Sequence, residues 1–71
     1  MIYRINHNCV QHQLEEILAW ADQHHCEYWR GRADQPGQYR FEWRISIRNP
    51  LLVTVFLLYW GSVVEWEADG G

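Results

Sequence analysis

The chain has no lysine, and all six of its basic residues are arginine. Nine Asp and Glu residues outnumber them, so the 71 residues carry a formal net charge of −3. A general nucleic-acid binder needs a clear positive excess to neutralise phosphates, so this balance argues against that class. Lysine is also depleted at protein–protein interfaces, whereas arginine is enriched there.

Long apolar segments and cysteines are scarce as well. The longest apolar run, Leu51 to Trp60, is interrupted by Thr54 and has about half the length of the ~20-residue helix that spans a membrane. No stretch shows the charged, apolar and small-residue order of a signal peptide. We therefore expect a soluble, cytoplasmic protein whose two cysteines, Cys9 and Cys26, are reduced thiols.

Large aromatic residues are abundant instead. Five tryptophans and four tyrosines accompany the arginines, and Trp, Tyr and Arg are the residues that anchor protein interfaces. A chain of this length forms one domain, residues 1–71, whose core is of marginal size. The aromatic residues can either fill that core or meet a partner. Residues 68–71 are expected to form a frayed tail.

The first part of the chain predicts a strand, a helix and a second strand. Residues 1–6 form the expected first strand. Asn8 is expected to cap the helix, with Gln11 providing the reciprocal bond. An apolar stripe at helical spacing supports this helix: Val10, Leu14, Ile17, Leu18 and Ala21. His24 and His25 are placed in its last turn, and residues 26–33 form the next strand.

A turn is predicted at residues 34–38, and the strongest strand pattern of the chain follows it. Apolar and polar side chains alternate strictly over ten residues, which predicts one face in the core and one in solvent. The apolar set is Tyr39, Phe41, Trp43, Ile45 and Ile47, and the polar set is Arg40, Glu42, Arg44, Ser46 and Arg48. Asn49-Pro50 ends the strand.

The last part of the chain predicts a helical turn near residues 50–53 and then a strand over residues 55–59. Gly61-Ser62 is expected to form a bulge or a hairpin turn before a final strand at residues 63–67. The predicted fold class is therefore α+β, with a single helix packed on a small, mostly antiparallel sheet in the order β-α-β-β-β. Such a sheet leaves its other face open.

The open face is the predicted partner-binding surface. In a strand, Leu57 and Tyr59 would project on that face beside a charged row, and apolar patches rimmed by polar groups mark contact sites. The predicted partner-binding residues are Arg40, Glu42, Arg44, Leu57 and Tyr59. Two alternatives stay open, namely that a second copy of the chain covers this face or that it is core on both sides. Nucleic acid is less favoured, because Glu42 interrupts the arginine row and Glu27, Glu65 and Glu67 can neutralise it.

Candidate metal ligands and nucleophiles gather at the two ends of the predicted helix: His7, Cys9, His12, His24, His25 and Cys26. The helix separates the two groups by more than about 20 Å. Zinc needs four ligands at one point, so we predict no metal site, and the same distance excludes a disulfide between the cysteines. Neither cysteine lies in a recognisable nucleophile motif, so we expect no cofactor and no enzymatic activity.

Residues 48–61 resemble a pattern of small proteins from bacteriophages and mobile elements. In that pattern a strand meets an Asp/Asn-Pro turn and then a strand of the form Phe-x-Leu-x-Trp-Gly, here Asn49-Pro50 followed by Phe56, Leu58, Trp60 and Gly61. The resemblance covers about a fifth of the chain. It implies a phage accessory protein of the anti-CRISPR or other host-inhibitor type, acting in the bacterial host cytoplasm. The partner would then be a host or defence-system protein; a structural homodimer and a nucleic-acid mimic are the alternatives.

Overall fold

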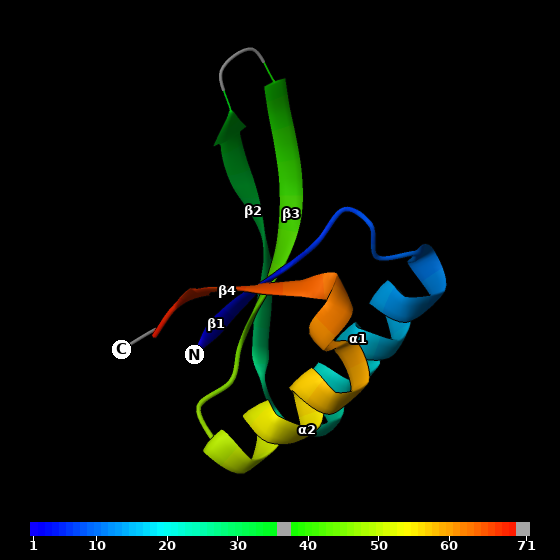
Figure 1. Cartoon of the computed structure of the whole chain (residues 1–71), viewed down its shortest axis with the longest axis vertical. Coiled ribbons are helices and arrows are strands. Elements are labelled where there is room, and N and C mark those ends of the chain that lie inside the picture. Colours follow the sequence, from blue (N-terminus) through cyan, green and yellow to red (C-terminus); the bar gives the residue numbers. More distant parts are fainter. Residues whose placement is uncertain (36–37, 70–71) are drawn as a thin grey trace.

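The chain folds into a small α+β domain (Figure 1). A computed structural model describes residues 1–35 and 38–69, with the side chains of residues 33–40 outside that description. The elements are β1 (Ile2–Ile5), α1 (Gln11–Gln23), β2 (Glu27–Gln35), β3 (Gln38–Ser46), α2 (Pro50–Trp60), the 3-10 turn η1 (Gly61–Val63) and β4 (Val64–Ala68). The predicted class and the β-α-β-β-β order are confirmed, and a second helix lies between the last two strands.

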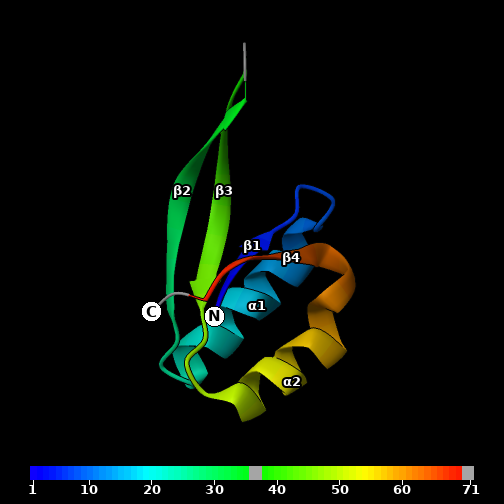
Figure 2. The same cartoon turned by 60° about the vertical axis from the view of Figure 1, so that its left-hand side comes forward.

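The four strands form one antiparallel sheet in the order β2-β3-β1-β4. Together with a helix after β1 and another after β3, this order is that of the ferredoxin-like, split β-α-β arrangement. Both helices lie on the same side of the sheet (Figure 2). The far ends of β2 and β3 project as a two-stranded ribbon beyond the rest of the molecule (Figure 1). The opposite face of the sheet is not covered by either helix.

Helix α1 begins later than predicted. Its N-cap is Val10, whose backbone N–H donates to the Gln13 side chain at 3.4 Å. The predicted cap at Asn8 with Gln11 is wrong, because the Asn8 N–H bonds to Asn6 Oδ1 at 2.9 Å in the turn that follows β1. The apolar stripe is largely confirmed. Ile17 and Ala21 are fully buried, Leu14 packs against the core and Leu18 is half-buried. Val10 is the exception, because it is exposed.

The end of α1 explains why both histidines follow the helix instead of lying in its last turn. His24 is the C-cap, and His25 adopts the left-handed conformation with φ 56°. The N–H groups of His25 and Cys26 donate to Asp22 O and Ala21 O at 3.3 and 2.8 Å. This pair of bonds is the Schellman motif, in which glycine more often takes the left-handed position.

Strand β3 shows the predicted alternation. Ile45 is fully buried, as is Ile47 directly after the strand, and Trp43 packs against the core. Phe41 has the same parity but is exposed, because it pairs with Arg32 of β2 in the part of β3 that lies beyond its pairing with β1. The side chain of Tyr39 and the predicted turn residues Pro36 and Gly37 lie outside the described residues.

The predicted strand at residues 55–59 is wrong, because this segment belongs to α2. The Asn49 side chain accepts a bond from the Leu51 N–H at 3.0 Å, and Pro50 occupies the first turn, so a complete helix N-terminus precedes the apolar run. Gly61-Ser62 lies in η1 and forms neither a bulge nor a hairpin turn. The final strand is confirmed and extends to Ala68. Ala68 therefore does not belong to the predicted frayed tail. Gly70 and Gly71 of that tail lie outside the described residues.

The core lies between the two helices and the sheet. Its buried residues are Tyr3, Ile5, Ile17, Ala21, Ile45, Ile47, Val53, Phe56, Val63 and Val64. The Phe56 ring lies 5.5 Å from the ring of Trp20, 5.6 Å from that of Tyr3 and 5.7 Å from that of Trp60. Three of the tryptophans, Trp20, Trp43 and Trp60, pack against this core, whereas Trp29 and Trp66 are exposed. Some of the abundant aromatic residues therefore fill the core, and others lie exposed on the surface.

Candidate functional site

The five predicted partner-binding residues do not form one surface. Glu42, Arg44 and the backbone of Arg40 belong to β3, whereas Leu57 and Tyr59 lie on α2, on the helical side of the sheet (Figures 1 and 2). The Arg40 side chain lies outside the described residues. The predicted juxtaposition is wrong because it required residues 55–59 to be a strand beside β3. The binding roles of the individual residues stay predictions.

Arg4 is at the centre of the charges on the open sheet face. Its Nη2 donates to Glu65 Oε2, and its Nε lies 3.1 Å from Glu42 Oε2 in an ion pair. Asn6 also donates to Glu65, at 3.3 Å. The hydrogen bond to Glu65 raises the pKa of Arg4, partial burial opposes this shift, and the charge of Glu42 adds to it. The carboxylates here are thus neutralised within the chain.

Arg44 is paired in the same way. Its Nε lies 2.8 and 3.0 Å from the two carboxylate oxygens of Glu67, and its side chain is only 12 % exposed. A Cβ atom on Gly31 of the neighbouring strand β2 would collide with the Arg44 guanidinium, so glycine leaves the space that this side chain occupies. The prediction that Glu67 can neutralise the arginine row is confirmed for Arg44. Its positive charge is therefore compensated within the chain.

The outer side of α2 is a different kind of surface. We call the side chains of Leu51, Val55, Leu57, Leu58 and Tyr59 the α2 surface. Their exposed fractions are 75, 37, 40, 81 and 71 %. Only Val53 and Phe56 of this helix are buried, and no residue from Pro50 to Trp60 carries a charge. A solvent-facing helix side is normally polar, so this surface is an exposed apolar patch of the kind that marks contact sites.

An open groove of about 610 Å³ between α1 and α2 continues the α2 surface. Its aromatic wall consists of Trp20, Tyr59 and Trp60, with the Trp60 ring 5.8 Å from that of Trp20 and 5.5 Å from that of Tyr59. Glu16, Gln23 and His24 supply its polar edge. The site therefore has the apolar centre and polar rim that are typical of protein interfaces.

Sequence reasoning missed the contribution of Leu51 and Leu58 to this surface. Leu51, Val55 and Leu58 recur at i, i+4 and i+7, the spacing of one helical stripe. Asn49-Pro50 is also a helix start signal. In a run where nearly every residue is apolar this spacing does not stand out, so only the start signal could have indicated the helix. The apolar run itself favours a strand with one open face, which is the structure predicted for residues 55–59.

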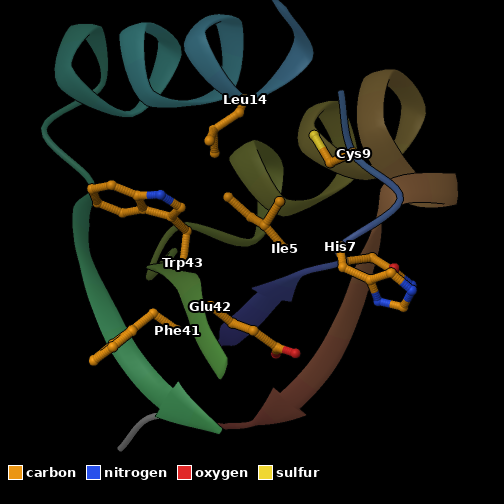
Figure 3. A pocket seen from close by; sticks show the side chains of 8 residues that line it. Ile5, His7, Cys9, Leu14, Phe41, Glu42 and Trp43 are labelled. Atoms are coloured by element: carbon orange, nitrogen blue, oxygen red, sulfur yellow. The ribbon is translucent and has the colours of Figure 1, made fainter. Parts of the chain in front are cut away.

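A smaller pocket of about 210 Å³ lies between β1, β3 and the start of α1 (Figure 3). Ile5, Leu14 and Trp43 point into it, whereas the imidazole of His7 and the carboxylate of Glu42 point away from that apolar cluster (Figure 3). The nearby Cys9 thiol donates to its neighbour Val10 O at 3.6 Å. Cys9 and His7 thus do not form the nucleophile–base pair that their closeness in sequence would allow.

The candidate metal ligands at the helix ends stay apart. Within the described part of the chain, no three His, Cys, Asp or Glu side chains come together in a way that could hold a metal ion. His12 instead contacts Glu16 at 2.9 Å, one turn along α1. Cys9 and Cys26 are both free thiols.

Both thiols are expected to react several-fold more slowly with a thiol-specific disulfide reagent in the folded protein than in concentrated urea. Burial raises the pKa of Cys9 and that of Cys26, so less thiolate is present. The unfolded thiols ionise from about pH 8.5, whereas the folded ones stay protonated to higher pH. Their contribution to stability is therefore complete below that pH and is lost as the pH rises above it. Equal reaction rates with and without urea would contradict this expectation.

The length of the helices also bears on the α2 surface. Although α2 is strongly apolar, it has 11 residues, and neither helix in the described ranges is long and apolar enough to cross a membrane. No protein-family model, no curated protein and no solved structure matches this chain.

Proposed function

We propose that this chain is a protein-binding module, not an enzyme, and that the α2 surface is its contact site. The observation that carries the proposal is the exposure of large apolar side chains, Leu51, Leu58 and Tyr59 above all, on a helix without charged residues. Monomeric proteins rarely expose contiguous apolar patches of this kind unless they have a use. The paired charges of the open sheet face give no comparable reason for binding, since a partner would have to displace existing ion pairs.

The partner that we propose is a host or defence-system protein in the bacterial cytoplasm, which the chain would inhibit by stoichiometric binding. The support is the sequence resemblance of residues 48–61 to phage accessory proteins, together with the Trp, Tyr and Arg content. The strand that the resemblance implies at Phe56 to Trp60 is helical here, so its support comes from the sequence pattern alone.

Affinity purification tests this proposal. The immobilised chain would be exposed to lysates of several bacteria, including hosts with active CRISPR systems, beside a Leu51→Gln/Leu58→Gln variant and a Phe41→Gln control. Phe41 is similarly exposed, at 62 %, but lies on the ribbon. We expect a protein to be recovered in near-stoichiometric amount by the wild type and the control and to be lost with the double variant, because glutamine keeps the helix but removes the apolar contact.

Two results would contradict the proposal. Recovery of no protein at near-stoichiometric level from any lysate would exclude a foreign partner in those hosts. Equal recovery by all three baits would show that a partner exists but binds elsewhere than at the α2 surface.

A further inference from the structure

The outer edge of β2 is an unpaired edge of the sheet. Within the described residues β2 pairs with β3 alone, since it comes first in the strand order β2-β3-β1-β4. No other segment runs along its projecting part in either view (Figures 1 and 2). Every second residue of an edge strand directs its N–H and C=O groups outward, so the nine residues of β2 present about four of each to the surroundings.

β2 is longer and more regular than β4, the strand at the opposite edge of the sheet. β4 has five residues, its register with β1 shifts between Ile2 and Tyr3, and Glu65 and Glu67 give it charge. Short length and irregularity are common protections of an edge strand against pairing with another chain. The register of β2 with β3 is regular over all nine residues, and β2 contains no proline. An added strand therefore fits at β2 better than at β4.

Arg30 gives the β2 edge an uncompensated positive charge. Its side chain is exposed and forms no ion pair within the described part of the chain. Its guanidinium lies over the ring of Phe41, 5.4 Å from the ring centre, which holds the side chain beside the strand and leaves the charge in place. Exposed Arg32 has the same strand parity. Residues 30–32 thus make one side of the edge basic, and the side chain of Asp34 lies outside the described residues.

Trp29 gives the other side of the edge an apolar character. Arg30 lies opposite Trp43, which packs against the core, so Arg30 projects on the helical side of the sheet. Trp29 lies opposite Arg44 on the open side and is 38 % exposed. A neighbouring strand would place acidic side chains beside Arg30 and apolar side chains beside Trp29, and cross-strand pairs of both kinds are favourable. The complementary strand is thus one in which acidic and apolar residues alternate.

The same charges disfavour a second copy of the chain at this edge. Antiparallel pairing of two β2 strands over their whole length is symmetric about Gly31. It sets Arg30 of each copy opposite Arg32 of the other. Like charges that lie directly opposite each other destabilise a sheet. An acidic strand therefore gains from the charges that two copies would bring into conflict.

From the free edge, its regular register and its charge we infer that β2 receives an extended acidic segment of another protein as an additional strand of the sheet. Main-chain hydrogen bonds would give this contact its affinity, and the alternating acidic and apolar side chains would give it its specificity. The edge is formed by β2 alone, so this contact is separate from the α2 surface. The inference therefore goes beyond the proposed function and does not depend on it.

Fluorescence anisotropy with a labelled peptide tests the inference. The probe has the length of β2, blocked ends and alternating Glu and Val residues, and a peptide of alternating Lys and Val is its control. We expect the acidic peptide to bind and the basic one not to bind. Arg30→Glu is expected to weaken binding by about tenfold or more, because it turns a favourable cross-strand pair into a repulsive one. Arg48→Glu makes the same charge change at an exposed arginine outside β2 and should leave binding nearly unchanged.

Backbone methylation tests whether the peptide binds as a strand. In one version of the probe every Glu nitrogen is methylated, and in the other every Val nitrogen. Alternate residues of a strand direct their N–H groups to opposite edges, so only one of the two sets faces β2. We expect one version to lose binding and the other to bind like the unmethylated probe. Amide hydrogen exchange followed by NMR should slow in β2 when the probe binds, but not in β4 or α2.

Absence of binding by the acidic peptide would overturn the inference, as would equal binding by the two methylated versions. Equal effects of Arg30→Glu and Arg48→Glu would refute the role of the β2 charge. Binding of a peptide with the sequence of β2 would indicate a second copy at this edge, and displacement of the probe by an oligothymidine would indicate nucleic acid; either result would overturn the acidic segment. The Leu51→Gln/Leu58→Gln variant should bind the probe like the wild type, so a failure of this inference leaves the proposed function standing.

Discussion

The Phe56→Ala variant is expected to lose about 3–5 kcal/mol of unfolding free energy, the range for removing a buried aromatic side chain. Phe56 is fully buried, and its ring contacts those of Tyr3, Trp20 and Trp60, which belong to β1, α1 and α2. Its removal leaves a cavity where these three elements meet. Because domains of this size are marginally stable, the variant is expected to be largely unfolded, as a thermal melt followed by circular dichroism would show.

Leu58→Ala is the matched control, measured at the lowest protein concentration that the melt allows. Leu58 is on the same helix but 81 % exposed, so the change is expected to stay within about 0.5 kcal/mol. The pair also tests the secondary structure. In a strand, residues 56 and 58 would share one face and both would matter, whereas a helix separates them. Equal destabilisation by the two substitutions would contradict the helix.

The Ile45→Ala variant is expected to be destabilised by about 2–5 kcal/mol. Ile45 is fully buried on the interior strand β3, where it lies opposite Tyr3 of β1 and Tyr28 of β2. The alanine would leave a cavity in the core between the sheet and the two helices. Urea unfolding monitored by tryptophan fluorescence would measure the loss as a lower midpoint.

Arg44→Ala is the control for Ile45→Ala. The neighbouring Arg44 points to the open face and forms an ion pair with Glu67; because its side chain is only 12 % exposed, its removal leaves Glu67 without a partner and is expected to cost about 1–2 kcal/mol. The variant should therefore unfold at a urea concentration between those of Ile45→Ala and the wild type. If Arg44→Ala is as destabilised as Ile45→Ala, the charged face is part of the structural core and not an open surface.

The regular parts of the fold could be predicted because their patterns are periodic. Ile45 and Ile47 alternate with polar residues, which only a strand with one buried face explains. Ile17 and Ala21 recur at helical spacing among polar residues. In both segments the residue types alone distinguish the buried positions, which are apolar, from the polar positions between them.

The C-terminal helix could not be identified in this way. From Leu51 to Trp60 nearly every residue is apolar, so neither a two-residue nor a 3.6-residue period is visible. The outcome was decided by two contributions: Asn49 and Pro50 start a helix, and Phe56 then fits between Tyr3 and Trp20. The second contribution depends on residues that are more than 30 positions away.

The candidate site likewise has features that could be predicted from the sequence and features that could not. That Glu67 can neutralise an arginine of β3 was predictable from charge and strand parity, and the pair with Arg44 bears this out. That Leu57 and Tyr59 lie on the other side of the sheet from Arg44 was not predictable, because one error in the secondary structure moves a whole segment to another face.

The sequence by itself determined the α+β class, the strand β3, the helix α1 and the presence of more large apolar side chains than so small a core can bury. The tertiary structure alone decided which of them remain outside. A helix packed on a sheet can bury only one of its sides, and the contacts of Val53 and Phe56 with the core leave Leu51, Leu58 and Tyr59 exposed.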